Sequence, residues 1–200
     1  MRTIRRAAVL VTLTALAGCS GNRSPGPPVS PASATEQALA EYDANKDGAL
    51  DAKELERSPG LLALLTALGK GPGDRLTADE LTQQLQALRD GAGLTRAACQ
   101  VLLDGRPLAG ATVRYVPERF LGPGFKPAAG TTDAAGFASL VTEGEREGVT
   151  PGLYRVEVSR KDAQDQETVP ARYNSQTTLG CQVGLQTRGA GTDVVFRLKK

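Results

Sequence analysis

The chain has 200 residues, 40% of them hydrophobic, which is enough apolar material for one medium-sized domain or two small ones. Its formal net charge is +2, and loss of the three arginines in its first six residues would lower this to −1, so no basic surface for nucleic acid is expected. The sequence contains no histidine, which excludes a histidine-containing catalytic triad, histidine general-base chemistry and His-ligated zinc or iron.

Residues 1–18 have the pattern of an export signal. A basic start is followed by an apolar run over 7–17, which is too short to cross a bilayer because a spanning helix needs about 20 residues. The LAGC sequence that ends at Cys19 resembles a bacterial lipobox. This resemblance implies cleavage before Cys19, lipidation of its sulfur, and an exported cell-envelope protein held on a membrane by several acyl chains. The alternative is an ordinary secreted protein that is cleaved elsewhere.

Residues 19–35 are expected to form a flexible tether that begins with the lipidated cysteine. They are rich in Ser, Pro, Gly, Asn and Ala and contain almost no large apolar residue. Such a segment cannot bury enough surface to offset its conformational entropy. The tether would hold the folded part of the chain away from the lipid surface.

Residues 43–54 match the twelve-residue EF-hand calcium pattern. Ca²⁺ takes roughly six to eight oxygen ligands, and alternate residues of a tightly wound loop can direct oxygens at one centre. Gly48, at position 6, permits the sharp turn because a residue without Cβ tolerates positive φ. The alternative is a polar turn that binds nothing. The predicted Ca²⁺ ligands are the side chains of Asp43, Asn45, Asp47, Asp51 and Glu54 and the carbonyl of Ala49.

Residues 36–92 are predicted to be a small helical EF-hand pair with one metal site. The segment 69–80 aligns with the first loop, so that Leu76 matches Leu50 and Glu80 matches Glu54. Glycines occupy its positions 1, 3 and 5, so we expect a degenerate second loop that has kept its fold and lost its ion. Thr77 and Glu80 fit a capping box for the following helix. The alternative is a plain helical hairpin.

From residue 97 to residue 200 the helical period gives way to short alternating strands. Apolar residues recur at every second position within 99–103, 113–115, 154–158, 179–185 and 194–198, and a turn over 132–136 leads into a further segment over 137–142. A Pro/Gly-rich loop is expected over 117–130. Short strands at this spacing predict an antiparallel β-sandwich, so the expected fold class is α+β with two domains.

Four segments of this region resemble the carboxypeptidase regulatory-like, or transthyretin-like, domains of exported bacterial lipoproteins. They are DGRPLAGATVRYVPE (104–118), GTTDAAGFASL (130–140), PGLYRVEVS (151–159) and VPARYN (169–174). The resemblance implies a seven-stranded, Ig-like sandwich with a role in binding or display. Enzymes on this fold depend on histidines, which this chain lacks, so no catalytic activity is expected.

Cys99 and Cys181 both fall on the inward phase of their strands. In an oxidising exported compartment we expect a disulfide between them, closing a loop of about 80 residues and contributing a few kcal/mol in the chain-entropy model. Inward orientation does not itself establish the separation that a bridge needs. The alternative is two buried thiols in separate parts of the core.

These features predict a calcium-binding, lipid-anchored envelope protein whose non-catalytic sandwich binds or displays an unidentified protein or glycan. Calcium would be a structural clamp with a dissociation constant of about 10⁻⁴ to 10⁻³ M. In the alternative, the sandwich is a recognition module and the metal loop only stiffens its stalk. An enzyme would have to use Asp133, Glu143, Glu145 or Glu147, and the last three form a charge run of the kind that is usually solvated.

Overall fold

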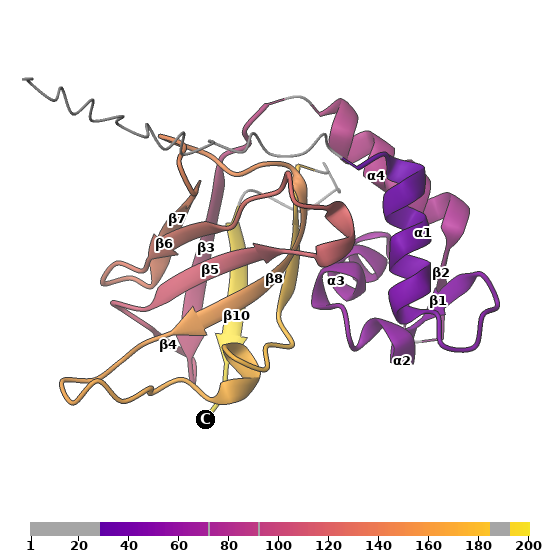
Figure 1. The fold of residues 1–200 in the computed structure, drawn as a ribbon. Coiled ribbons are helices and arrows are strands. Elements are labelled where there is room, and N and C mark those ends of the chain that lie inside the picture. The colour runs from indigo at the N-terminus through magenta and orange to yellow at the C-terminus, as the bar shows by residue number, and fades with distance from the viewer. Residues whose placement is uncertain (1–28, 72, 92, 185–192) are drawn as a thin grey trace, which may run out of the picture.

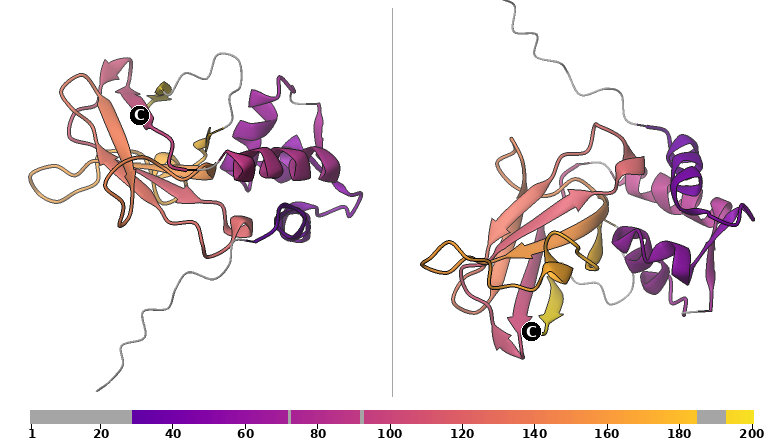
Figure 2. Two further views of the ribbon diagram at one scale, coloured as in Figure 1. Left: turned by 90° about the horizontal axis from the view of Figure 1, so that it is seen from above. Right: turned by 60° about the horizontal axis from the view of Figure 1, so that its bottom comes forward.

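The computed structural model describes residues 29–71, 73–91, 93–184 and 193–200. A helical part precedes a β part, and Figure 1 shows the helices gathered against one end of a curled sheet. The view from above in Figure 2 shows the same side-by-side arrangement. The expected export signal, the Cys19 lipidation site and most of the tether lie outside the described residues. Within the described ranges, no helix combines the length and apolar character needed to cross a membrane.

Helix α1 (Pro31–Tyr42) begins earlier than the sequence predicts. Ser30 caps it by accepting a hydrogen bond from a backbone N–H three residues later, and a proline with its preset φ occupies the first turn. Thr35 is buried and its hydroxyl lies 2.9 Å from that of Thr82 on the neighbouring helix. The prediction that residues 31–35 belong to the tether is therefore wrong. Their small side chains have a linker composition, but they also allow close packing between helices.

The helical part contains two loop-and-helix units joined by a short two-stranded sheet. Strands β1 and β2 pair antiparallel, with Leu50 directly opposite Leu76, and both leucines are fully buried. The alignment of the two loops predicts this meeting. The remaining elements of this part are β1 (Ala49–Asp51), α2 (Ala52–Leu55), α3 (Pro59–Ala67), β2 (Arg75–Thr77) and α4 (Ala78–Asp90).

The β part begins at Ala97, as predicted, and consists of one curled, mostly antiparallel sheet of eight strands. The strand order is β10-β3-β7-β6-β5-β8-β9, with β4 paired to β3. Strand β7 pairs with β3 through its first four residues and with β6 through its last two, so it turns the sheet over the core. The strands are β3 (Ala97–Leu103), β4 (Arg106–Pro107), β5 (Thr112–Pro117), β6 (Ala128–Thr131), β7 (Phe137–Thr142), β8 (Gly152–Ser159), β9 (Gly180–Val183) and β10 (Asp193–Leu198).

The structure confirms the predicted antiparallel sandwich only in part, as one curled and mostly antiparallel sheet. Strand β10 pairs parallel to β3, which corrects the all-antiparallel expectation. Alternation of Phe196 and Leu198 with exposed neighbours fixes which face of β10 is buried, but it carries no information on strand direction. Strand β6 lies partly inside the predicted Pro/Gly-rich loop over 117–130. Its small residues pair with β5 and β7 and give no alternating signal.

Cys99 and Cys181 are buried thiols in this structure, and no disulfide joins them. They are not in separate parts of the core, as the alternative supposes, because the Tyr115 side chain forms hydrogen bonds with both. Burial raises the pKa of Cys181 well above its ordinary value, so the thiol form is favoured there. The expected disulfide is therefore absent, and a tyrosine hydroxyl lies between the two positions.

The helical and β parts share a hydrophobic core. Leu153 of β8 and Phe120 of the short helix η1 (Arg119–Leu121) pack among the leucines of the helices. Helix α3 also lies directly on β9, where a Cβ added to Gly180 would be 1.8 Å from the Pro59 carbonyl oxygen. Only glycine fits this approach. The loops of the helical part are therefore carried on a base that is fixed to the sheet.

Glu118 connects the two parts through a buried carboxylate. It is 2% exposed, and its Oε1 accepts a 2.9 Å hydrogen bond from the Gly60 N–H in the first turn of α3. The Arg155 guanidinium of β8 lies 3.9 Å from its other oxygen. Burial raises the pKa of Glu118, although the Gly60 N–H and Arg155 oppose this shift. A carboxylate at a helix N-terminus also complements the helix dipole.

Candidate metal centre

The loop over 43–54 follows directly from α1 and winds tightly before entering β1. Two residues adopt left-handed conformations, Lys46 with φ of 59° and Gly48 with φ of 81°. No atom lies within 4 Å of a Cβ built on Gly48, so glycine is needed there for its backbone angle and not for space. The tight turn expected at position 6 is present.

The first two predicted ligands direct their oxygens at the amides of the same loop. Asp43 accepts hydrogen bonds from the Asp47 N–H (3.3 Å) and the Gly48 N–H (3.0 Å). Asn45 Oδ1 accepts a 2.9 Å hydrogen bond from the Asp47 N–H as well. These contacts wind the chain around its own side-chain oxygens, so the segment is a loop and not a continuation of α1.

Glu54 closes the loop from its far end. Its Oε1 accepts hydrogen bonds from the Ala44 N–H (2.9 Å) and the Asn45 N–H (3.3 Å), at the beginning of the loop. Its Oε2 accepts one from the Asp51 N–H (3.0 Å), while the Asp51 side chain caps the Glu54 N–H at 2.9 Å. The carboxylate is buried, with 8% of the residue exposed. Positions 9 and 12 thus form a capping box for α2 and also join the two ends of the loop.

Asp47 faces the second loop. Its Oδ2 forms an ion pair with Arg75 of β2, and its Oδ1 accepts a 3.1 Å hydrogen bond from the Ala49 N–H. Desolvation opposes ionisation, but the Ala49 N–H, the Asn45 amide and the Arg75 guanidinium together hold the pKa of Asp47 below its ordinary value. The Arg75 guanidinium therefore already balances the negative charge of Asp47, one of the predicted calcium ligands.

The second loop contains a cation of its own. Lys70, at its position 2, extends its ammonium to the Arg75 carbonyl oxygen (2.7 Å) and to Glu80 Oε1 (2.5 Å). Arg75 and Glu80 occupy positions 7 and 12, which correspond to Ala49 and Glu54 of the first loop. The hydrogen bond from Lys70, together with the Thr77 N–H, holds the pKa of Glu80 below its ordinary value. An ammonium group thus contacts the two positions whose oxygens would bind an ion.

The donor set of the first loop fits Ca²⁺ in kind, since every predicted ligand is an oxygen and all six lie in one tightly wound loop. The side chains are not drawn to a single point. In the described part of the chain, no three His, Cys, Asp or Glu side chains gather into a group that could hold a metal ion. The carboxylates of Glu54 and Asp43 instead accept hydrogen bonds from backbone N–H groups, and that of Asp47 forms an ion pair with Arg75. Calcium at this site therefore stays a prediction, and binding would have to exchange these contacts for the ion.

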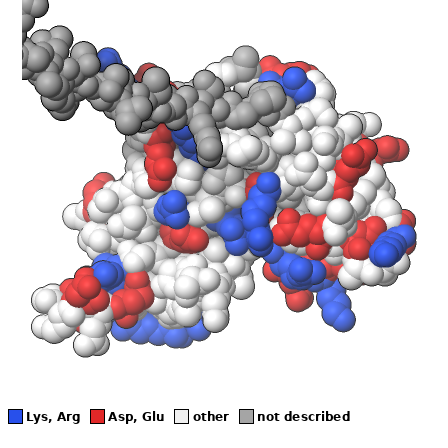
Figure 3. Space-filling view, in the orientation of Figure 1, with Lys and Arg blue, Asp and Glu red and all other residues white. Residues whose placement is uncertain are grey.

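The carboxylates considered for catalysis have structural roles or lie in solvent. Asp133 accepts hydrogen bonds from the Ala135 N–H (2.8 Å) and the Phe137 N–H (2.9 Å), which shapes the turn before β7. Glu143 lies 3.7 Å from Arg114 at the surface. On the described surface shown in Figure 3, acidic and basic side chains are interspersed over the helical part, without an extended basic patch.

Three residues with defined roles near the loops were not singled out by sequence reasoning. Lys70 and Arg75 supply cations to the loops, and Glu118 holds α3 on the sheet. Only the position of Lys70, immediately after position 1 of a loop without acidic ligands, could have drawn attention to it. Comparison with protein-family models, curated proteins and solved structures finds no match to this chain.

Proposed function

We propose that this chain is a calcium-binding, lipid-anchored protein of the cell envelope with a non-catalytic β module that binds or displays a partner. In this proposal the helical part is an EF-hand pair with one ion site, in the loop over 43–54. The observation that carries the proposal is the closure of this loop by Glu54, whose carboxylate reaches the amides of Ala44 and Asn45. The lipid anchor rests on the LAGC sequence at Cys19.

The pairing of the two loops supports the assignment to an EF-hand pair. Strands β1 and β2 place position 7 of one loop opposite position 9 of the other, with the position-8 leucines in the middle. Both loops also carry a capping box between positions 9 and 12. A plain helical hairpin, the alternative from sequence, requires neither the central strand pair nor this repeated cap.

Calcium would be held by Asp43, Asn45, Asp47, Asp51 and Glu54 with the Ala49 carbonyl, and it would act as a structural clamp. The ion would supply divalent charge at the centre of a loop that now relies on single N–H donors. The loop is connected to the sheet, because β1 leads through α2 to α3. Helix α3 packs on β9 and is capped by Glu118, so ordering of the loop would also restrain the contact between α3 and the sheet. Calcium would thus stiffen the helical part, on which the β module is packed.

Calorimetric titration of residues 20–200, which retain every described element, tests the metal site. We expect one calcium ion per chain with a dissociation constant of about 10⁻⁴ to 10⁻³ M. The Asp43→Ala variant should lose the calcium heat, while Asp79→Ala, an exposed acid in the first turn of α4, should keep it. Absence of heat at several times the expected concentration, or unchanged binding in Asp43→Ala, would reject the site.

Lipid anchoring requires a separate test in cells. The full chain should incorporate radiolabelled fatty acid and fractionate with membranes, whereas Cys19→Ala should do neither. Labelling that persists in Cys19→Ala would remove the anchor from the proposal and leave the calcium site unaffected.

One observation favours the second candidate function, in which the β module is the recognition element and the calcium loop only a stalk component. Gln100 of β3 is paired with Val195 of β10 on one side and with Phe137 of β7 on the other. Phe137 and Val195 are 43% and 41% exposed, unusual values for large apolar side chains. The three residues form one row across the outer face of the sheet, of the kind that partner surfaces use.

Paired variants of the full chain separate the two functions. If recognition is independent of calcium, a captured partner protein or glycan should still bind Asp43→Ala and should be lost in the double variant Phe137→Ser/Val195→Ser. If calcium governs display, the order is reversed: chelation and Asp43→Ala should weaken capture, and the double variant should not.

A further inference from the structure

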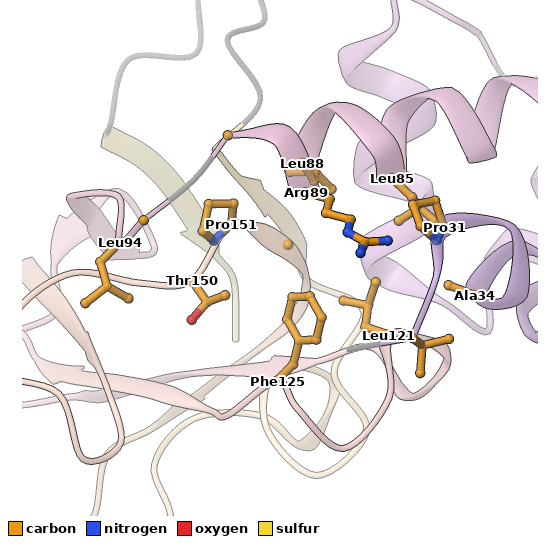
Figure 4. A pocket seen from close by; sticks show the side chains of 14 residues that line it. Pro31, Ala34, Leu85, Leu88, Arg89, Leu94, Leu121, Phe125, Thr150 and Pro151 are labelled. Carbon is orange, nitrogen blue, oxygen red and sulfur yellow. The ribbon is translucent and has the colours of Figure 1, made fainter. Parts of the chain in front are cut away.

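A cavity of about 340 Å³ lies between the helical and β parts, and it is not used by the proposed metal site. Its walls come from the start of α1, the end of α4, the segment after η1 and the start of β8. Figure 4 shows Leu88, Leu121, Phe125 and Pro151 around the space. A volume of this size falls at the lower end of the range of about 300 to 1,000 Å³ for small-molecule sites.

The lining has one charged residue in an otherwise apolar environment. Arg89 is the only charged side chain among the fourteen lining residues, and Thr150 is the only other polar one. In Figure 4 the Arg89 guanidinium points from α4 toward the space between Pro31 and Phe125. Within the described residues, Arg89 forms no ion pair with a carboxylate. The adjacent Asp90 is hydrogen-bonded to Gln86 along the same helix, at 2.7 Å.

The rim of the cavity also exposes apolar surface. Leu94, in the segment that joins α4 to β3, lines the cavity and is 44% exposed. Buried Leu88 and Leu121 continue this apolar surface inward, since each is at most 5% exposed. An apolar ligand could therefore pass from the rim to the interior without meeting a polar wall, and Arg89 would remain within reach of one end of it.

We propose that this cavity binds a single-chain anionic amphiphile of the fatty-acid class. The hydrocarbon chain would lie against Leu88, Leu121 and Phe125, and the carboxylate would bind Arg89. The guanidinium suits this role because its planar array of donors matches a carboxylate and it keeps its charge at all accessible pH values. The modest volume favours one chain over a two-chain lipid.

Dodecanoate, titrated below its aggregation range into residues 20–200 and followed by calorimetry, tests this proposal. We expect saturable binding of one molecule per chain, with a hydrocarbon chain of the same length on a cationic head, dodecyltrimethylammonium, binding at least about tenfold more weakly. Arg89→Gln should weaken dodecanoate binding by about tenfold or more, the usual scale for losing a charge-assisted hydrogen bond. Arg106→Gln is the matched control, since Arg106 is an exposed arginine of β4 outside the cavity.

Circular dichroism checks that each variant is folded. We expect Arg89→Gln to fold normally, because Arg89 is exposed. Equal binding of the anionic and cationic compounds, or unchanged dodecanoate affinity in Arg89→Gln, would overturn the proposal. Binding that appears only when the chain is shortened to begin at Val29 would assign the cavity to the chain's own leading segment and would also overturn it. Calcium titration of Arg89→Gln should be unchanged, so this result and that of the metal site can be told apart.

Discussion

The two loops of the helical part share a frame but solve the same electrostatic problem in different ways. In the first loop, five oxygen-bearing side chains accept hydrogen bonds from backbone N–H groups, and no cation of the loop itself contacts Glu54. In the second loop, the glycine-rich start leaves no acidic ligands, and the Lys70 ammonium binds Glu80 and the Arg75 carbonyl. A side-chain cation thus contacts the oxygens at positions 7 and 12 of the second loop, whereas in the first loop only backbone N–H groups contact the position-12 carboxylate.

The largest effect should come from removing the carboxylate at position 12 of the first loop. Glu54→Ala leaves the Ala44, Asn45 and Asp51 amides without their acceptor, so the free energy of unfolding should fall by about 2 to 3 kcal/mol in the absence of calcium. The same variant should lose its calcium heat in calorimetry. Urea denaturation without calcium measures the loss of stability, and calorimetric titration measures the loss of calcium binding. Equal stability of variant and wild type would show that this closure contributes nothing.

A smaller, opposite effect is expected when the bridge between the two loops is removed. Arg75→Gln releases the Asp47 carboxylate from its ion pair, so calcium affinity should rise by about two- to fivefold, as is usual for an exposed pair. The gain should be largest at low ionic strength, because salt already screens the pair in wild type. Weaker calcium binding in Arg75→Gln would mean that Arg75 positions Asp47 for the ion and does not compete with it.

The second loop should respond only in stability. Lys70→Met removes the ammonium but keeps much of the stem, and the cost should be about 0.5 kcal/mol, because the Lys70 and Glu80 side chains are 25% and 37% exposed and solvent screens the pair. Calcium stoichiometry should remain one ion per chain. A second bound ion in Lys70→Met would show that the ammonium blocks a site that the glycine-rich loop can otherwise form.

The smallest predicted effect is a difference in acid sensitivity. The pKa of Glu80 is lowered in the folded chain, so the stability contributed by the Lys70–Glu80 pair is complete above the ordinary glutamate pKa of 4.5 and is lost as the pH falls through the lower folded-state value. Lys70→Met should lack this part of the acid transition. Parallel melting curves of wild type and Lys70→Met between pH 3 and pH 7 measure the difference, which should be confined to the acidic end.

Sequence patterns succeed in this chain where a residue's role depends on its near neighbours. The twelve-residue pattern places Gly48 at a tight turn, and the alignment of the loops predicts that Leu50 and Leu76 meet. Both Glu54 and Glu80 take part in capping boxes, which are set by residues three apart. Alternation in the β part likewise predicts the buried faces of β3, β5, β8, β9 and β10. It gives no face for β7, where Phe137 is exposed.

The features that sequence patterns miss depend on contacts between distant segments. Glu118 caps α3 from 58 residues away, and β10 takes its parallel direction from the path of the chain and not from its own residues. Residues 31–35 have the composition of a linker, but they are helical because α1 packs against α4. The calcium pattern does not point to Lys70, since its position 2 has no required residue type, and only the lack of acidic residues around Lys70 at the start of the loop sets it apart.

One measurement tests the contrast between the loops most directly: a calcium titration of ¹⁵N-labelled residues 20–200, followed by NMR at the amides of both loops. The account predicts that the Ala44 and Asn45 N–H resonances, which report on Glu54, shift and saturate with one ion per chain in the range of about 10⁻⁴ to 10⁻³ M. The Gly71 N–H, which donates to Asp74 in the second loop, should barely change. Shifts of equal size in both loops, or in neither, would contradict the account.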